Sequence, residues 1–467
     1  MLFITAYANH SIKIKSYPMN LILQTKYLFA RTIILILFGN IILFAVEPDS
    51  LLIRNDETVK IDLIRIEGNE TTKDFIILRE LTFQIGDSVS GKTLRFNRER
   101  VFSLRLFNQV EFKIEKATDK NILVIQLTES WYLYPLPLLR IQDGDFNKST
   151  YGINLSYRNF RGRNESLRAT IGFGYDPFYS FSYDNPALSY ENGIGLSFAF
   201  AYVKSTNKSE NAKAIIGEDF TNKMYLQSIS ISKRLNQFNI GFLTIGFNYI
   251  ETPYTRSGIT ASGNNIDRVP FAGLSYLYDS RDLKQFSVNG LYTFASFTHY
   301  GFSINDINYN QFSIDFREYR KVVDDFAAKW RVKYRTAFGN VVPFYEYSYL
   351  GYFDHVRGHL HDVREGKSFI LASLEISHPI VKEWNFHVKI PFLPEKLTSA
   401  RIGIYLTSFF DTGDAFDRND KLAIKNFYYG YGFGITFLFL PYNAMRFEYA
   451  VNENGIGEFV IGSGFSF

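Results

Sequence analysis

The sequence predicts a mostly β protein, in which a small α+β domain precedes a transmembrane antiparallel β-barrel of about 16 strands. Three observations predict this fold. Aromatic residues make up 17% of the 467 residues, with 46 Phe and 32 Tyr, which is more than ordinary globular domains use. Alternating strands follow one another from residue 150 to the end, without a helical pattern between them. Residues 61–130 combine helical and strand patterns.

An apolar run near the start is typical of a secretory signal. The run TIILILFGNIILFAV spans residues 32–46 and follows a basic flank. It is short for a membrane-spanning helix, whereas a charged flank, an apolar core and a small residue such as Ala45 fit a signal peptide. We expect residues 1–45 to be the signal peptide, with Met19 as an alternative start and a retained anchor as the alternative structure. Residues 46–60 are then a linker.

Charge and cysteine content exclude several function classes. The chain has 51 Lys and Arg against 47 Asp and Glu, for a formal charge of +4, and the two signs are intermixed. Nucleic acid is therefore not an expected partner. The sequence contains no cysteine, which excludes disulfide frameworks and thiolate zinc sites.

The segment 61–130 predicts a β-α-α-β-β unit. The segment IDLIRIEGNE predicts a strand that ends near Gly68, and KDFIILREL predicts a helix capped by Thr71 or Thr72. GKTLRFNRERVFSLRLF predicts a second helix, and QVEFKIEK and NILVIQLTE predict a closing hairpin. Such a unit is just large enough to sustain its own core. Residues 131–149 are expected to be a linker.

The strands of 150–467 each have one apolar face. In SLRATIGFGY, for example, Leu167, Ile171 and Phe173 alternate with small or polar residues. A soluble sheet of this length needs a second layer to cover its apolar face, and no sequence remains to form one. A membrane barrel needs none, because lipid covers its outer face.

Charged residues indicate which parity of each strand faces the lumen. An arginine on the lipid face at mid-membrane costs about 2–4 kcal/mol. By this rule Ile402, Leu406 and Leu374 face lipid. The same rule turns inward the following charged residues: Asp279, Arg281, Glu375, Arg401, Asp411, Arg446 and Glu448.

The loop motif Val356, Arg357, Gly358 and His359 precedes the strand that carries Glu375. A guanidinium can bridge carboxylates in a bidentate manner. We therefore expect this loop to fold into the lumen, where Arg357 would bind barrel-wall partners among Asp411, Glu375, Asp279 and Arg281. Gly358 permits a sharp tip. A solvent-exposed Arg357 is the alternative.

Neither a metal site nor a catalytic site is expected. Asp354, His355, His359, His361 and Asp362 carry ligand types that suit zinc. Their spacing is not diagnostic, and a polar loop is the preferred interpretation. No G-x-S-x-G elbow or comparable constellation is present, so we predict no enzyme activity and no cofactor.

Several of these segments resemble one family. The pattern I..I.I.GN..T....I.REL....GD, followed by V....LF..V.F.I, resembles a POTRA domain of the BamA/TamA-type outer-membrane protein assembly factors, the bacterial surface antigen family. VRGH resembles the VRG(F/Y) signature of that superfamily, and FFDTGDAF its lumenal aspartate motif. YDSRD and GFGITFLFLPYNAMRFEYA look like its barrel segments. Two positions depart from the pattern: His359 replaces an aromatic residue, and Ser287 stands where proline is frequent.

The end of the chain, IGSGFSF, resembles an outer-membrane assembly signal through Gly462, Phe465 and Phe467. A final strand must pair with the first strand to remove its edge. We expect Phe459, Phe465 and Phe467 to share the lipid-facing parity with Ile461.

The resemblance implies a location and a function. The barrel is expected in the bacterial outer membrane, in contact with its lipid, with the POTRA domain in the periplasm. The implied task is to insert or translocate polypeptides, with unfolded outer-membrane or secreted polypeptides as clients and periplasmic accessory proteins as further partners. A weak seam between the first strands, near residues 151–160, and the last strand would template clients. A dedicated exoprotein secretion pore of the two-partner type and a passive diffusion channel are the alternatives.

Overall fold

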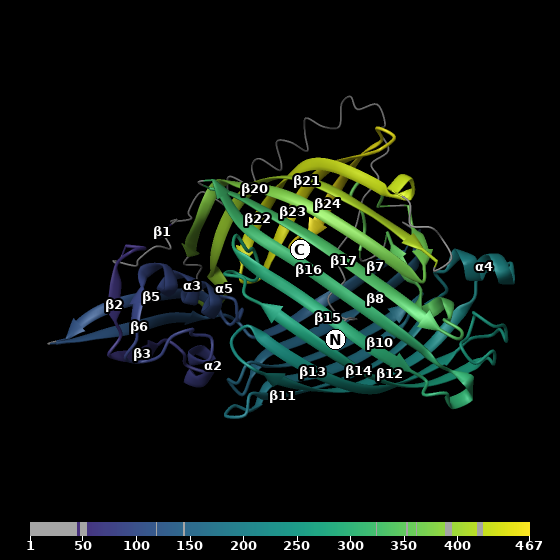
Figure 1. Cartoon of the computed structure of the whole chain (residues 1–467), viewed down its shortest axis with the longest axis horizontal. Helices are drawn as coiled ribbons and strands as arrows, with labels where there is room; N and C mark the ends of the chain where they lie inside the picture. Colours follow the sequence, from purple (N-terminus) through teal and green to yellow (C-terminus); the bar gives the residue numbers. More distant parts are fainter. Residues whose placement is uncertain are drawn as a thin grey trace.

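The computed structural model describes residues 44–46, 54–117, 119–142, 145–323, 325–351, 354–360, 362–387, 395–417 and 424–467. A small α+β domain lies against one end of a large barrel (Figure 1). The predicted signal peptide lies outside the described residues, apart from the start of β1 (Phe44–Val46), which pairs antiparallel with the end of β20. No helix within these described ranges has the length and apolar character needed to cross a membrane.

The α+β domain has the predicted elements in the predicted order, together with two short strands that were not predicted. Its main sheet has the order β3 (Leu63–Glu67), β6 (Lys120–Glu129) and β5 (Phe107–Ala117), with β3 parallel to β6. A two-stranded ladder joins β2 (Thr58–Lys60) to β4 (Ser88–Ser90). The helices α2 (Asp74–Leu78) and α3 (Gly91–Phe102) complete the domain. Fully buried side chains from these elements form its core: Ile76, Ile77, Leu94, Val101 and Phe112.

The two helices begin in different ways. The Ser90 hydroxyl accepts the Thr93 N–H at 3.2 Å and caps α3. The predicted threonine cap of α2 is wrong, because Lys73 occupies the N-cap position without a side-chain hydrogen bond. Thr72 instead donates its hydroxyl to Glu129 at 2.6 Å and accepts the Asn159 amide at 2.8 Å. It thereby ties the domain to the barrel.

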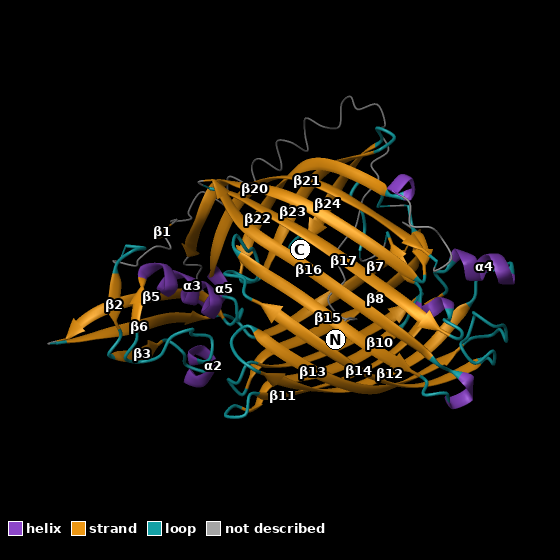
Figure 2. Cartoon of the chain, viewed as in Figure 1, coloured by secondary structure: helices purple, strands orange, loops and turns teal. Residues whose placement is uncertain are grey.

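Sixteen strands of the described chain form the barrel (Figure 2). They are β7 (Leu133–Gln142), β8 (Asp145–Phe160), β9 (Glu165–Gly174), β10 (Phe178–Ser189), β11 (Ile194–Thr206), β12 (Thr221–Arg234), β13 (Asn239–Glu251), β14 (Ile266–Asp279), β15 (Gly290–Tyr300), β16 (Tyr309–Val323), β17 (Phe326–Gly339), β20 (Ser368–His387), β21 (Ser399–Phe416), β22 (Tyr428–Leu440), β23 (Asn443–Asn452) and β24 (Gly457–Ser463). Each pairs antiparallel with the next along this order, from β7 to β24. The strands β18 (Ser348–Leu350) and β19 (Arg364–Gly366) form a separate hairpin.

The barrel begins earlier than the sequence predicts. Residues 131–149, expected to be a linker, include β7 and the start of β8, which pair in register from Leu133↔Tyr157 onward. The expectation is wrong here because LYPLPLLRIQ is apolar on both parities and contains two prolines, so it lacks the alternation of a half-buried strand. β2 likewise lies within the linker expected at 46–60.

Side-chain parity follows the predicted rule. Leu274, Leu374 and Leu406 are outward and 64%, 45% and 45% exposed, whereas Glu375 and Asp411 are inward and only 2% exposed. Exposed apolar side chains on the outer wall are the expected surface of a barrel in lipid.

A hydrophobic cluster lies at each end of the barrel. The core of the α+β domain continues into Leu283, Phe286 and Leu438 of the barrel. At the opposite end, loops pack in a smaller cluster that includes Ala212 of α4 (Glu210–Ile216) and Phe344 of η2 (Phe344–Glu346). Other short helical segments are η1 (Ile304–Asp306), α5 (Glu395–Thr398) and η3 (Ile424–Asn426).

Candidate functional site: a charged loop anchored inside the barrel

The loop between β18 and β19 enters the barrel lumen. Val356 is 2% exposed and packs with Leu350, Phe369 and Leu371. This apolar contact places the next residue, Arg357, against the barrel wall, where it is 4% exposed. Burial of an arginine is tolerated only where its charge and its donors find partners.

Arg357 binds Asp411 of β21 through the Nε and Nη2 edge of its guanidinium. Nε donates to Oδ2 at 2.6 Å and Nη2 to Oδ1 at 2.9 Å, and the backbone N–H of Arg357 also donates to Oδ2 at 3.2 Å. The guanidinium lies 3.6 Å from the centre of the Phe409 ring. A bidentate ion pair of this kind fixes orientation as well as distance.

Two further acids share the same guanidinium. Nη1 donates to Glu375 of β20 at 3.2 Å and to Glu448 of β23 at 2.9 Å. Glu375 also binds Lys329 at 2.6 Å, and Glu448 binds Arg446 at 3.2 Å. Three carboxylates therefore face three cations, and Arg357 is the cation that joins three strands, β20, β21 and β23, to the loop. We call these six side chains the lumenal ion cluster.

Glycines give the loop room to approach the wall. Gly358 has φ of +97°, a conformation that suits glycine at the tip. A Cβ on Gly430 of β22 would lie 1.8 Å from the Arg357 carbonyl oxygen. Gly432 and Gly434 follow on the same inward parity, each with a neighbour too close for a side chain. This role of the glycines was not predicted, although glycine at every second position in GYGFG was the available signal.

Asp354 anchors the same loop to another part of the wall. Its carboxylate binds Arg331 at 3.2 Å and Lys333 at 2.6 Å, both on β17. The loop is thus held by an acid at one point and by a base three residues later. Asp354 was predicted only as a candidate metal ligand, and its contact with β17 was not predicted.

His359 is occupied by contacts of its own. Its ring stacks on Tyr428 with 4.3 Å between centroids, and its nitrogens lie 2.8 Å from Asp362 and 2.6 Å from Glu453. His361 lies outside the described residues. The residues that the structure describes contain no group of three or more His, Asp and Glu able to hold a metal ion.

Asp279 and Arg281 do not belong to the lumenal ion cluster, contrary to the prediction. Arg281 binds Asp279 with both Nε and Nη2, at 2.8 and 3.0 Å. The pair lies where β14 ends, beside the α+β domain, whose Arg100 donates to the Asp279 carbonyl at 3.2 Å. Inward parity was correctly predicted, but parity carries no information on position along the barrel axis.

The C-terminal aromatic residues also lie elsewhere than expected. β24 ends at Ser463, and Gly464, with φ of +105°, redirects the chain. Ser466 accepts a hydrogen bond from Lys329 at 2.5 Å and donates to Glu375 at 3.2 Å. The centre of the Phe467 ring lies 4.9 Å from Nζ of Lys329. Phe465 packs against the core shared with the α+β domain.

These two aromatics therefore do not face lipid, because the chain leaves the strand before them. Phe459 and Ile461 do face outward, as predicted. Gly462 faces inward, where a Cβ would lie 2.9 Å from the Arg446 guanidinium.

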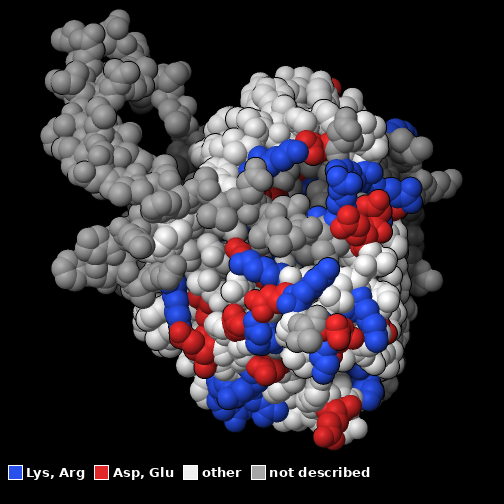
Figure 3. All heavy atoms as spheres, turned by 90° about the vertical axis from the view of Figure 1, so that its left-hand side faces the viewer, with Lys and Arg blue, Asp and Glu red and all other residues white. Residues whose placement is uncertain are grey.

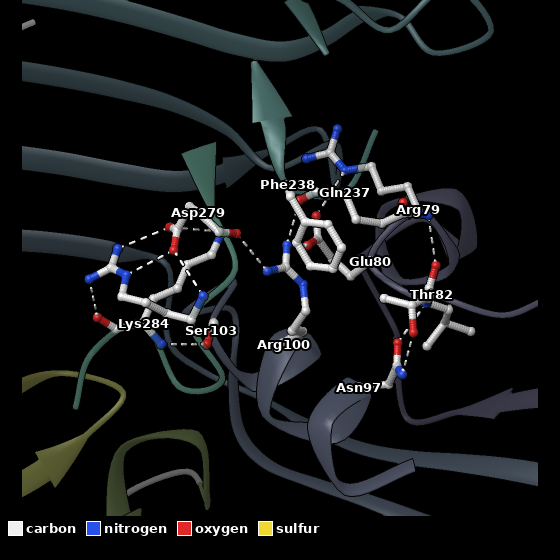
Figure 4. Close-up of polar contacts among 12 residues, drawn as sticks. Arg79, Glu80, Thr82, Asn97, Arg100, Ser103, Gln237, Phe238, Asp279 and Lys284 are labelled. Carbon is white, nitrogen blue, oxygen red and sulfur yellow. Dashed lines mark hydrogen bonds and ion pairs between the residues drawn. The ribbon is translucent and has the colours of Figure 1, made fainter. Parts of the chain in front are cut away.

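A second buried ion cluster joins the α+β domain to the barrel (Figure 4). Glu80 is 2% exposed and binds Arg100 of α3 at 2.9 Å and Arg234 of β12 at 2.7 Å. Arg100 also donates to the Gln237 carbonyl at 2.7 Å. Burial alone would raise the pKa of Glu80, but the charges of Arg234, Lys284 and Arg100 hold that pKa well below its usual range.

The end of the molecule that carries the domain shows interspersed charges (Figure 3). Lys and Arg lie next to Asp and Glu across this face, and ion pairs such as Arg65 with Glu115 at 2.6 Å join them. This face therefore carries charges of both signs.

Comparison with known proteins identifies the family. The Omp85 superfamily domain model matches residues 159–467, and the POTRA model described as a surface antigen variable number repeat matches residues 59–130. The outer membrane protein assembly factor BamA of Nitratidesulfovibrio vulgaris is 23% identical over 324 residues, which cover 66% of this chain and 38% of that protein. The chain therefore spans well under half the length of this relative.

The fold is similar to that of a solved structure. CdiB from Escherichia coli has a TM-score of 0.51 at 13% identity, covering 86% of this chain and 76% of that one. BamA from Haemophilus ducreyi lacking POTRA domains 1–3 has a TM-score of 0.49 at 16% identity, covering 95% and 94%. The family models together cover the domain and most of the barrel. The chain thus belongs to the Omp85 superfamily, as an outer-membrane barrel with a POTRA domain on its periplasmic side.

Proposed function

We propose that this protein inserts or translocates polypeptides at the outer membrane, by opening the junction between its first and last barrel strands. The observation that carries the proposal is the junction itself. β24 stands next to β7 as a hydrogen-bonded neighbour in the sheet order, and the residue-by-residue registers described for the barrel run from β7 through to β24 without one for this pair. We call this junction the seam.

The composition of β7 supports a weak seam. Pro135 and Pro137 have the same parity and pair with Leu155 and Ile153 of β8. Proline has no N–H to donate, and within sheets it is found where the missing donor faces away from the neighbouring strand. Both nitrogens are therefore expected on the β24 side. An edge that lacks two successive donors pairs poorly, so the edge of β24 that it faces remains free to accept a client strand.

The POTRA domain offers an edge for clients before they reach the barrel. In the described sheet, β5 pairs on one side with β6 and is an edge on the other. It has eleven residues, and its end, from Glu115 to Ala117, is exposed. Backbone pairing at such an edge accepts many sequences, because side chains contribute little to recognition. Unfolded outer-membrane or secreted polypeptides are the clients that this mode suits.

A disulfide across the seam tests the proposal. The chain has no cysteine of its own, so a cysteine at Leu138 of β7, combined in turn with one at each position of β24, reports only on the seam. We expect the oxidised pair to stop assembly of a client barrel and a reductant to restore it. Undiminished client assembly with a locked seam would refute the proposal.

A second test adds the missing donors. The double substitution Pro135→Val and Pro137→Val should strengthen the seam, raise the temperature at which the barrel unfolds on a semi-native gel, and slow client assembly. Leu139→Val on the same strand is the control, because it adds no donor. Equal gel behaviour of the two proteins would mean that the prolines do not weaken the seam.

Dedicated secretion of one exoprotein through the lumen is the alternative that the anchored loop favours. Polar contacts hold that loop, and polar contacts can be exchanged for others during transport. This alternative predicts conductance in a planar bilayer only when the loop is released, for example in Arg357→Ala, together with client specificity. A passive diffusion channel predicts steady conductance of the intact protein, which the loop and the C-terminal residues inside the lumen argue against.

A further inference from the structure

The outer wall of the barrel contains an open groove of about 520 Å³ near the POTRA end. Its volume lies within the roughly 300–1,000 Å³ of small-molecule sites. It crosses β12 to β16, which lie side by side in Figure 1, and these strands are far from the seam in the sheet order. The groove therefore belongs neither to the lumenal ion cluster nor to the proposed client path.

Two adjacent rows of outward side chains create the groove. One row runs Lys233, Gly241, Tyr276 and Ala295 in register, and the next row towards the membrane centre runs Ile231, Leu243, Leu274, Phe297 and Phe312. The second row is large and apolar, whereas the first contains Gly241 and Ala295. A Cβ on Gly241 would meet nothing within 4 Å. The small side chains of the first row therefore leave a depression that is bordered by the large side chains of the second row.

The groove has one charged end. Lys233 is adjacent to Gly241 in the register and is exposed on the outer wall. Its ammonium donates to the Asn192 carbonyl at 2.6 Å, which holds it at the rim and leaves two of its three donors free for a ligand. Lys233 also lies near the turn whose Gln237 contacts the POTRA domain. The charged end is thus at the periplasmic boundary of the membrane.

We propose that this groove binds a glycerophospholipid of the periplasm-facing leaflet, with an acyl chain beneath Leu243, Leu274 and Phe297 and the phosphate at Lys233. The outer wall is in contact with hydrocarbon, so an apolar hollow there is filled by an acyl chain rather than by water. A fixed ammonium at headgroup depth attracts the phosphate of the same molecule. Tyr276, in the same row as Lys233, suits the membrane interface.

Native mass spectrometry of the full mature chain, released from detergent with added phosphatidylglycerol, tests this site. We expect wild-type protein to retain one phosphatidylglycerol that Gly241→Leu does not retain. A leucine side chain would occupy the space above Gly241, where an added Cβ meets nothing within 4 Å. Ala169→Leu is the matched control, since Ala169 also faces outward, between Leu155 and Phe181. Equal retention by the two leucine variants would overturn the proposal.

The charged end is tested separately. Lys233→Gln should weaken phosphatidylglycerol retention by roughly fivefold, the usual contribution of one lysine near an anionic surface. It should leave retention of digalactosyldiacylglycerol, an uncharged lipid with the same acyl chains, unchanged. If wild-type protein retained both lipids equally, the assignment of the phosphate to Lys233 would be wrong. Semi-native gels verify that each variant is folded, and Ala295→Leu replaces Gly241→Leu if the latter is not.

Discussion

Removal of Arg357 is expected to release the lumenal loop while the barrel stays folded. In Arg357→Ala, Glu375 keeps Lys329 and Glu448 keeps Arg446, but Asp411 loses its bidentate partner. Removing one member of a buried ion pair costs about 3–5 kcal/mol. If this cost falls only on the state in which the loop is inside the lumen, the fraction of molecules with the loop withdrawn rises on the order of 10²-fold or more.

Labelling of a cysteine at Val356 measures this fraction. Val356 is buried in the closed loop, and the chain contains no other cysteine. The rate of reaction with a maleimide therefore follows the withdrawn population when opening and closing are fast. Client assembly should be lost in parallel, with the heat-modifiable band of the folded barrel still present.

The matched control is Arg317→Ala. Arg317 is also a lumenal arginine, but its partner Asp315 keeps Arg331 at 2.9 Å after the substitution. The further substitution Asp411→Asn in the Arg357→Ala background should recover part of the loss, because it removes the unpaired charge. If Val356→Cys reacted as slowly in Arg357→Ala as in Arg317→Ala, the lumenal ion cluster would not be what holds the loop.

Three other substitutions test separate contacts. Gly430→Ala places a Cβ where the loop backbone now lies, so it should release the loop with every charge intact, giving fast labelling at Val356. Asp354→Asn removes the second anchor and should give a smaller increase in that labelling. Glu80 has a lowered pKa, so its contribution to POTRA docking is present above its ordinary pKa of about 4.5 and is lost as pH falls below it. Spin labels on the POTRA domain and the barrel should show their separation broaden on acidification, and Glu80→Gln should broaden it at neutral pH and remove the acid dependence.

Much of the fold could be predicted because periodicity directly reflects burial. The helical and alternating patterns of 61–130 gave the order of elements in the POTRA domain, and parity placed Glu375 and Asp411 in the lumen. β7 was missed since its apolar residues occupy both parities, so the first strand was assigned to what is β8. Thr72 was misassigned because a threonine before a helix caps it by local geometry, whereas here Glu129 and Asn159 bind it from elsewhere in the fold.

The candidate site was only partly predictable for a related reason. A carboxylate that points into the lumen can bind Arg357 only if it lies at the same level along the barrel axis. The alternation of residues in the sequence does not give that level. Asp411 and Glu375 meet that condition, and Asp279 does not. The inward turn at Gly464 depends on where β24 stops pairing, which no local pattern shows. Phe465 and Phe467 were therefore assigned to lipid.

The opposite signs of the two loop anchors have a consequence for anything that replaces the loop. Withdrawal would uncover Arg331 and Lys333 on β17 and Asp411 on β21, which lie on the same part of the wall with only β20 between them. The emptied lumen would then carry an electric field around the circumference of this wall rather than along the barrel axis. A polypeptide passing through it would be rotated so that its acidic side chains turn towards β17 and its basic ones towards β21.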